Sequence, residues 1–219
     1  MPRLSLVSRA DIDDPVAKFI YDKKFRGRDP ATEPGQTASG APGNYEAVFA
    51  HSPDVLEHTL QGFFLKQTKK RKVPLNYLEL AISRVGWGCS CRWMYSEHSK
   101  ILRGLGYSEG ALGAISCWQT SDAFDAAERV VLAYADCIAF DHGRTPDSLF
   151  GQLEAHFDEE QIVELTYIIS MFMMNAGMIR ALRLEHDDYD ERVREMPSPP
   201  EYRFVDAEPE PLPRRTKAP

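Results

Sequence analysis

Glu79 is the first residue of the chain whose position points to chemistry rather than to packing. It lies among Leu75, Leu78 and Ile82, whose three- and four-residue spacing predicts the buried stripe of a helix. A buried carboxylate without a partner costs several kcal/mol, and it tends to take up a proton or to find a cation. The sequence therefore predicts a partner for Glu79 elsewhere in the fold.

The partner is expected on the next helix, which the pattern begins near Ser90, after a break at residues 86–88. One face of that helix carries Cys91, Met94, Tyr95, His98 and Leu102 at i, i+3, i+4, i+7 and i+11. If the two helices pack as a hairpin, Glu79 faces this column and meets its imidazole. A buried His–Glu pair can hold a proton near neutral pH, although inward histidines and Cys/Met/Tyr stripes also serve as ordinary packing.

These residues resemble a motif of the carboxymuconolactone decarboxylase and alkylhydroperoxidase D-like superfamily. The motif reads Glu, eleven residues, Cys, two residues, Cys, three residues, His. Glu79, Cys91 and His98 match it with the same gaps, whereas Met94 stands at the second cysteine. The resemblance extends from about residue 45 to about residue 187 and includes the segments FAHSPDVLEH and FDAAERVVLAYA. It implies an all-α fold that assembles into homo-trimers or hexamers.

The resemblance offers two kinds of chemistry. Members with two motif cysteines use them as a redox pair that reduces a peroxide or disulfide. Met94 cannot form a disulfide, and Cys89 would have to replace it beside Cys91, within the narrow geometry that a disulfide allows. The decarboxylase branch instead implies acid–base catalysis without redox chemistry, in which His98 carries the proton and Glu79 sets its protonation state. We prefer this second reading, and we keep the thiol-dependent peroxidase as the alternative.

The substrate is expected to be flat and cyclic. An apolar wall for it would come from Trp87, Trp93, Met94 and Tyr95. Asn175 either lines the site or satisfies backbone groups. Such a site suits decarboxylation, elimination or isomerisation of a ring derived from an aromatic compound, with Cys91 as proton donor, nucleophile or packing. A third hypothesis is a non-catalytic binding protein on the same fold.

Composition limits the partners. The chain of 219 residues has 26 Lys and Arg against 33 Asp and Glu, a net charge of −7 that argues against nucleic acid as a partner. Its four cysteines are too few for a disulfide scaffold, and the short apolar run near the N-terminus does not predict a signal peptide. We expect a cytoplasmic protein. The other histidines show no metal-ligand spacing, and no phosphate-binding glycine loop occurs, so neither metal nor cofactor is predicted.

The fold class is predicted as all-α, a compact bundle of about eight helices, because no segment alternates at period two. Helix starts are expected at Asp14–Pro15, Ser52–Pro53, Ser108, Ser121, Thr145–Pro146 and Asp158, the last with Gln161 in a capping box. Three regions follow: a helix and arm at 1–44, the helical domain at 45–187, and a Pro-rich charged tail at 188–219.

Two long segments need separate interpretation. The apolar run at 162–182 approaches the length of a membrane span, but Glu164, Asn175 and Arg180 interrupt it. We interpret it as a central helix buried by its own domain and by other subunits, and we predict no membrane contact. The tail has no evident core to join, so we expect it to be disordered or to lie on a partner chain.

Overall fold

Helices make up all the regular structure in the part of the chain that can be described. The computed structural model describes residues 2–33, 37, 40, 43–185 and 193–215. Within them the α-helices are α1 (Pro15–Phe25), α2 (Asn44–Phe49), α3 (Pro53–Gln67), α4 (Leu75–Gly88), α5 (Arg92–Gly104), α6 (Glu109–Ala114), α7 (Ala126–Phe140), α8 (Asp147–Glu154) and α9 (Glu159–Leu182). Two 3₁₀ helices, η1 (Arg9–Asp11) and η2 (Ile115–Thr120), complete the list. The predicted all-α class is confirmed.

Side-chain caps start several of these helices. Asp14 accepts hydrogen bonds from the backbone nitrogens of Val16 and Ala17 at the start of α1, and Asp158 and Gln161 form the predicted capping box of α9. The predicted start at Ser121 is wrong. Ser121 instead follows η2, and α7 begins five residues later, where Asp125 and Glu128 form a second capping box.

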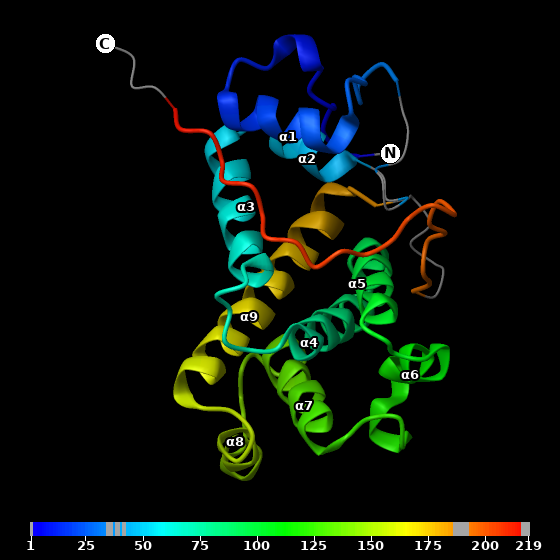
Figure 1. The fold of residues 1–219 in the computed structure, drawn as a ribbon, viewed down its shortest axis with the longest axis vertical. Coiled ribbons are helices and arrows are strands. Elements are labelled where there is room, and N and C mark those ends of the chain that lie inside the picture. The colour runs from blue at the N-terminus through cyan, green and yellow to red at the C-terminus, as the bar shows by residue number, and fades with distance from the viewer. Residues whose placement is uncertain (1, 34–36, 38–39, 41–42, 186–192, 216–219) are drawn as a thin grey trace.

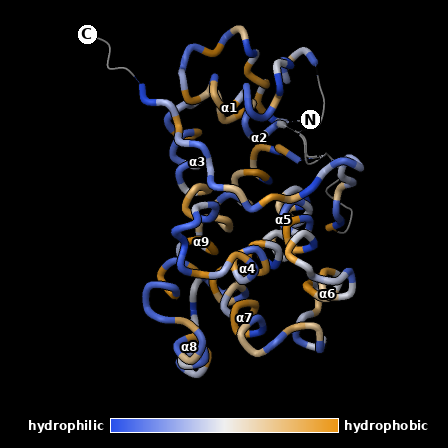
Figure 2. Tube along the Cα trace, viewed as in Figure 1, coloured by the Kyte–Doolittle hydropathy of each residue, from blue (hydrophilic) through white to orange (hydrophobic). Residues whose placement is uncertain are grey.

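Helix α4 lies at the centre of the bundle and packs on α5, α7 and α9 (Figure 1). It is buried on nearly every side, which suits its run of leucine, isoleucine, alanine and valine. The predicted break at 86–88 is displaced, because α4 continues to Gly88 and the turn falls at 89–91. Ser90 takes a left-handed φ of 54° there. Figure 2 shows apolar residues recurring along the helices, with hydrophilic residues between them.

Helix α9 is the long apolar helix that the sequence predicted. Among the described residues it alone is long and apolar enough to cross a membrane, and half of its apolar window is buried inside the chain. It packs on α3, α4, α7 and α8, as expected of a core helix. Its outer side is not covered by this chain: Val163, Tyr167 and Met174 are 69%, 46% and 47% exposed. Assembly into homo-oligomers and a cytoplasmic location stay predictions.

The C-terminal strap, residues 193–215, differs from what was expected of the tail. It lies on its own chain, crossing α9 between α3 and α5 before it runs along α3 (Figure 1). Met196 is 3% exposed and its backbone nitrogen donates to Ser96, and Arg215 pairs with Asp14 at the far end. The strap joins the bundle mainly through hydrogen bonds and ion pairs, which hydropathy patterns do not reveal. The boundary at 44/45 stays a prediction, and the one at 187/188 lies outside the described residues.

Candidate active site

Glu79 and His98 meet at the centre of the bundle. Glu79 is fully buried on α4 and His98 is 5% exposed on α5. His98 Nδ1 lies 2.5 Å from Glu79 Oε2, so the predicted contact between the buried carboxylate and the imidazole is confirmed. An ionised carboxylate only accepts hydrogen bonds, so Nδ1 carries the proton and Nε2 is the basic nitrogen of the neutral ring.

Lys66 is a third member of the site that the sequence analysis missed. It stands near the end of α3, is 5% exposed, and its Nζ donates a 2.6 Å hydrogen bond to Glu79 Oε1. Lysine at this position continues the inward stripe of Leu56, Leu60 and Phe63, just as Glu79 interrupts the stripe of α4. A charge on a buried stripe was therefore the available signal, and it occurs once on each of two neighbouring helices.

The electrostatics of the three residues favour an ionised Glu79 and a neutral His98. Burial would raise the pKa of Glu79, but the Lys66 ammonium and then His98 outweigh it and lower that pKa to about 2. Burial lowers the pKa of His98, and Lys66 lowers it further, against the opposing effect of Glu79. Lys66 and Glu79 thus balance each other's charge, and His98 is left as a base near neutral pH.

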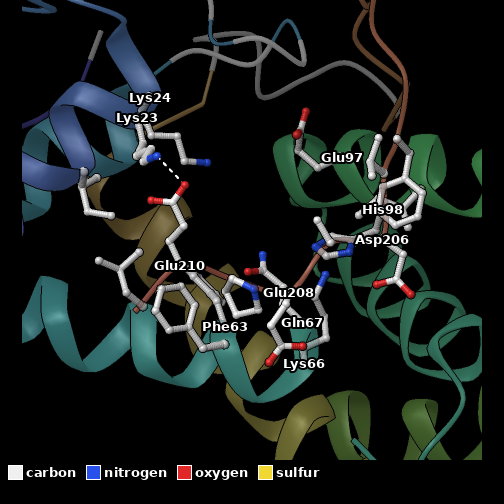
Figure 3. Close-up of a pocket in the computed structure, with 18 of the residues that line it drawn as sticks. Lys23, Lys24, Phe63, Lys66, Gln67, Glu97, His98, Asp206, Glu208 and Glu210 are labelled. Carbon is white, nitrogen blue, oxygen red and sulfur yellow. Dashed lines mark hydrogen bonds and ion pairs between the residues drawn. The ribbon is translucent and has the colours of Figure 1, made fainter. Parts of the chain in front are cut away.

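All three residues line one cavity of about 460 Å³, large enough for a small organic ligand (Figure 3). Much of its wall is aromatic or aliphatic, from Phe19, Ile20, Tyr45, Leu60, Phe63, Phe64, Trp93, Ile101 and Phe172. Trp93 stacks parallel to Tyr45, with 5.8 Å between the ring centroids. The Phe172 ring stands edge-on to His98 at 5.0 Å. Such flat apolar walls favour a planar ligand.

The C-terminal strap supplies one wall of this cavity through residues 204–210. Asp206 pairs with Lys69 at 2.6 Å and with Arg71 at 2.8 Å. Glu210 pairs with Lys23, another lining residue, at 2.6 Å (Figure 3). The strap therefore covers the cavity from the side opposite the bundle core.

Comparison with known proteins adds distant relatives. No protein-family model matches the chain. It is 28% identical over 106 residues to the uncharacterized protein YdfG of Bacillus subtilis (strain 168), which covers 48% of this chain and 72% of YdfG. It is also 28% identical over 126 residues to the uncharacterized protein YnjA of Escherichia coli (strain K12), covering 56% of this chain and 69% of YnjA.

Solved structures decide the fold. An uncharacterized peroxidase-related protein from Ralstonia eutropha JMP134, described as an alkylhydroperoxidase AhpD core, superposes with a TM-score of 0.61 at 17% identity, over 84% of this chain and 94% of that one. The chain has the alkylhydroperoxidase D-like fold. The chain is also similar to the debrominase Bmp8, with a TM-score of 0.63 at 17% identity over 85% of this chain and 93% of Bmp8. An uncharacterized peroxidase-related protein from Silicibacter sp. TM1040 gives 0.64 at 13% identity, over 88% and 98%.

Within this alkylhydroperoxidase D-like fold, only some of the predicted wall residues reach the cavity. Trp93 lines it directly. Asn175 stands one layer behind: it accepts a 2.9 Å hydrogen bond from the Tyr45 hydroxyl and donates one of 3.0 Å to the Met171 carbonyl oxygen. Of the two roles left open by the sequence, Asn175 therefore satisfies backbone and does not line the cavity, although it orients Tyr45, which does.

The other three predicted wall residues point elsewhere. Met94 is fully buried in the core against Gly86. Tyr95 donates from its hydroxyl to the Leu112 carbonyl oxygen on α6. Trp87 packs under the Arg84 guanidinium at 4.8 Å. The sequence pattern predicts one face for this helical stripe. In the structure α5 is enclosed on several sides, so residues 94 and 95 meet α4 and α6 instead of the cavity.

Cys91 matches the motif, but it is not one of the described residues that line the cavity. It occupies the N-cap position of α5 and is fully buried. Burial, and next the nearby Glu185 carboxylate, raise the pKa of the Cys91 thiol well above its usual range. A thiol attacks as the thiolate, so this environment suppresses its reactivity. Cys89 is half-buried and burial raises its pKa as well.

No group of three or more possible metal ligands occurs among the described residues. The groups in the cavity that can move or stabilise a proton at its buried end are Lys66, Glu79 and His98. This arrangement suits proton transfer to or from a carbon or oxygen atom of a ligand, with one base and one cation beside it.

Proposed function

We propose that this protein is an acid–base enzyme, a lyase or isomerase acting on a small cyclic molecule, with His98 as the base. The observation that carries the proposal is the hydrogen-bonded series Lys66–Glu79–His98 at the wall of an apolar cavity. The decarboxylase-like branch of the superfamily is the nearest functional analogy, and it rests on the motif resemblance.

The mechanism follows from the position of the proton. Glu79 accepts the Nδ1 proton, fixes the tautomer of His98, and stabilises the imidazolium that forms when Nε2 takes a proton from the substrate. The C–H or O–H electron pair stays on the substrate, and the same imidazolium returns the proton to another atom. Isomerisation, elimination and protonation after loss of carbon dioxide all use this pair of steps.

The shape of the cavity supports a ring as substrate. Trp93, Tyr45, Phe63 and Phe172 present flat faces and edges, and such surfaces pack best on a planar group. A variant of the similar debrominase Bmp8 has been crystallised in complex with 2,3,4-tribromopyrrole, which is a small aromatic ring. We infer that the ligand of this chain has a comparable size and flatness.

Thiol chemistry is the weaker alternative. The buried Cys91 and the replacement of the second motif cysteine by Met94 argue against a redox pair, because a buried thiol with a raised pKa is a poor nucleophile. Intact-mass measurement after mild peroxide tests it directly. A reversible loss of two daltons at Cys89 and Cys91 would support the peroxidase-like hypothesis, and no loss is expected.

A proton-transfer assay tests the proposal itself. The butenolide α-angelica lactone isomerises when a base removes a ring proton, and the conjugated product is followed by ultraviolet absorbance; exchange of ring protons in D₂O is followed by mass spectrometry. We expect catalysis by the wild type, its loss in His98→Gln and its retention in Cys91→Ala. A binding protein without activity would bind such rings but leave both rates at the uncatalysed level.

We also infer that the protein acts as a homo-oligomer. The exposed apolar side of α9 is the surface that supports this inference, since Val163, Tyr167 and Met174 lack cover from their own chain. Light scattering after size exclusion tests it, with Val163→Lys expected to shift the mass to that of a single chain.

A further inference from the structure

We propose that Lys66 binds an anionic oxygen of the ligand, so that the cavity takes a planar ring bearing a carboxylate or a carbonyl that becomes an enolate. This inference rests on the proposed function, because it assigns a second role beside the base His98. It names the substrate class through chemistry that is present in the cavity wall.

The ammonium of Lys66 has hydrogen-bonding capacity to spare. A lysine carries three N–H donors, and the structure gives Nζ one hydrogen bond, to Glu79 Oε1. The described residues offer it no second acceptor. Lys66 lines the cavity, so its two remaining N–H donors are available to an acceptor atom of a ligand in the cavity. Buried donors left without partners cost free energy, and a ligand oxygen would remove that cost.

Most other charged side chains around the cavity are in ion pairs, and Glu208 accepts hydrogen bonds from the Thr68 hydroxyl and the Lys69 backbone nitrogen. Lys23 pairs with Glu210 and Lys24 with Glu46. The acidic members follow the same pattern, Glu97 with Lys100 and Asp206 with Lys69 and Arg71. Glu79 differs from them, because one carboxylate serves both Lys66 and His98.

That sharing leaves room for one negative charge. With His98 neutral, Lys66 and Glu79 sum to zero. When His98 holds a proton, the three residues carry one net positive charge, and a ligand anion beside Lys66 restores neutrality in a place where an unbalanced charge is costly. The negative charge that develops on the ligand oxygen is thus balanced as His98 takes up the proton.

The ring and the oxygen of the ligand have separate places. The Phe172 ring lies beside both polar groups, with its centroid 5.9 Å from Lys66 Nζ and its ring edge-on to His98. Phe63 packs on Phe172 at 5.6 Å and continues the apolar surface. A ligand ring on this surface presents one substituent to Lys66 and one ring position to His98.

The reaction then balances without an added reactant. His98 Nε2 takes a proton from the carbon beside a carbonyl, the C–H electron pair forms a C=C bond, and the carbonyl pair moves to oxygen. Lys66 donates a hydrogen bond to that oxygen, where the negative charge develops. The imidazolium returns its proton to a different carbon, and the oxygen regains its double bond.

Benzoate and benzamide test the assignment, because they have the same shape and differ in charge. Calorimetric titration of the full-length wild type should give an affinity for benzoate roughly tenfold or more above that for benzamide, the effect of a hydrogen bond to a charged group. Lys66→Arg should keep this preference. His98→Gln should keep it as well while losing the proton-transfer activity, so that the two proposals fail separately.

Lys66→Met leaves Glu79 without its cation and can fail to fold, so the double variant Lys66→Met/Glu79→Gln is the main test. It removes both charges and should bind the two compounds equally. Glu79→Gln alone should bind benzoate more tightly than the wild type, a gain that a purely structural lysine would not produce. Equal or undetectable binding of both compounds to the wild type at millimolar concentration, or a benzoate preference that survives in the double variant, would overturn the assignment.

Discussion

Gly86 of α4 lies directly against the backbone of Tyr95 in α5: a Cβ at Gly86 would stand 2.7 Å from the Tyr95 nitrogen. The two helices can approach this closely only because residue 86 has no side chain. The same approach brings Glu79 and His98, on the same pair of helices, within hydrogen-bond distance.

Gly86→Ala should therefore separate the two helices. We expect a loss of at least about 1–3 kcal/mol in the free energy of unfolding, because the obstacle is backbone and cannot rotate away. Gly151→Ala is the matched control: Gly151 lies inside α8 with nothing within 4 Å of its Cβ position, and alanine there should stabilise by about 0.5–1 kcal/mol. Denaturant unfolding measures both, and equal effects would contradict the close-packing account.

Glu79→Gln should be among the most destabilising single changes. It leaves the buried ammonium of Lys66 without its counter-charge, a situation that typically costs about 3–5 kcal/mol. The control is Asp141→Asn, which breaks an exposed pair with Arg144 and should stay within about 0.5 kcal/mol of the wild type. If both variants unfold at the wild-type denaturant midpoint, Glu79 does not neutralise Lys66.

Stability should fall in two stages as the pH is lowered. The pKa of His98 lies below its ordinary 6.5, so the unfolded chain takes up this proton first and the folded state loses stability as the pH falls through that range. The pKa of Glu79 lies near 2 instead of 4.5, so its contribution is complete above about 4.5 and is lost between there and about 2. Unfolding curves of His98→Gln should lack the first stage and those of Glu79→Gln the second. Superposable pH profiles for all three proteins would contradict this assignment.

The strap should open locally without unfolding the bundle. The exposed Glu208 carboxylate accepts hydrogen bonds from the Lys69 backbone nitrogen at 2.6 Å and from the Thr68 hydroxyl at 2.9 Å. Glu208→Gln should leave the denaturant midpoint of global unfolding close to that of the wild type, because exposed pairs contribute little to stability, yet speed hydrogen exchange at the Lys69 amide and over residues 204–210. Added salt should speed the same exchange in the wild type. The Asp141→Asn variant serves again as the control. If it speeds hydrogen exchange over residues 204–210 as much as Glu208→Gln does, local opening of the strap is contradicted.

Local sequence rules predicted much of this fold because its helices carry their own signals. Asp14 and Asp158 cap as expected, and the stripe of α4 placed Glu79 inside. The start of α7 was misplaced because Ser121 and Asp125 are both plausible caps, and only the capping box with Glu128 distinguishes them.

The missing parts of the site depend on contacts between distant residues. Lys66 on α3 pairs with Glu79 on α4. In the sequence, Lys66 comes just before the basic run at 69–72 and is not distinguished from it by residue type. The strap reaches the cavity through ion pairs such as Arg71–Asp206, which join residues 135 positions apart. The hydrophobic periodicity of a sequence reports local structure and does not indicate contacts between such distant residues. Cys91 shows the converse, because its residue type matches the motif while its side chain is buried at the N-cap position of α5, away from the cavity.

The central claim is that His98, held by Glu79, moves the proton while Cys91 does not take part. The most direct measurement is the isomerisation rate of α-angelica lactone against pH for the wild type, His98→Gln and Cys91→Ala. We predict a wild-type rate that rises with pH as His98 loses its proton and levels off by neutral pH, the same profile for Cys91→Ala, and only the uncatalysed rate for His98→Gln. A rate that survives in His98→Gln and disappears in a folded Cys91→Ala would contradict the account.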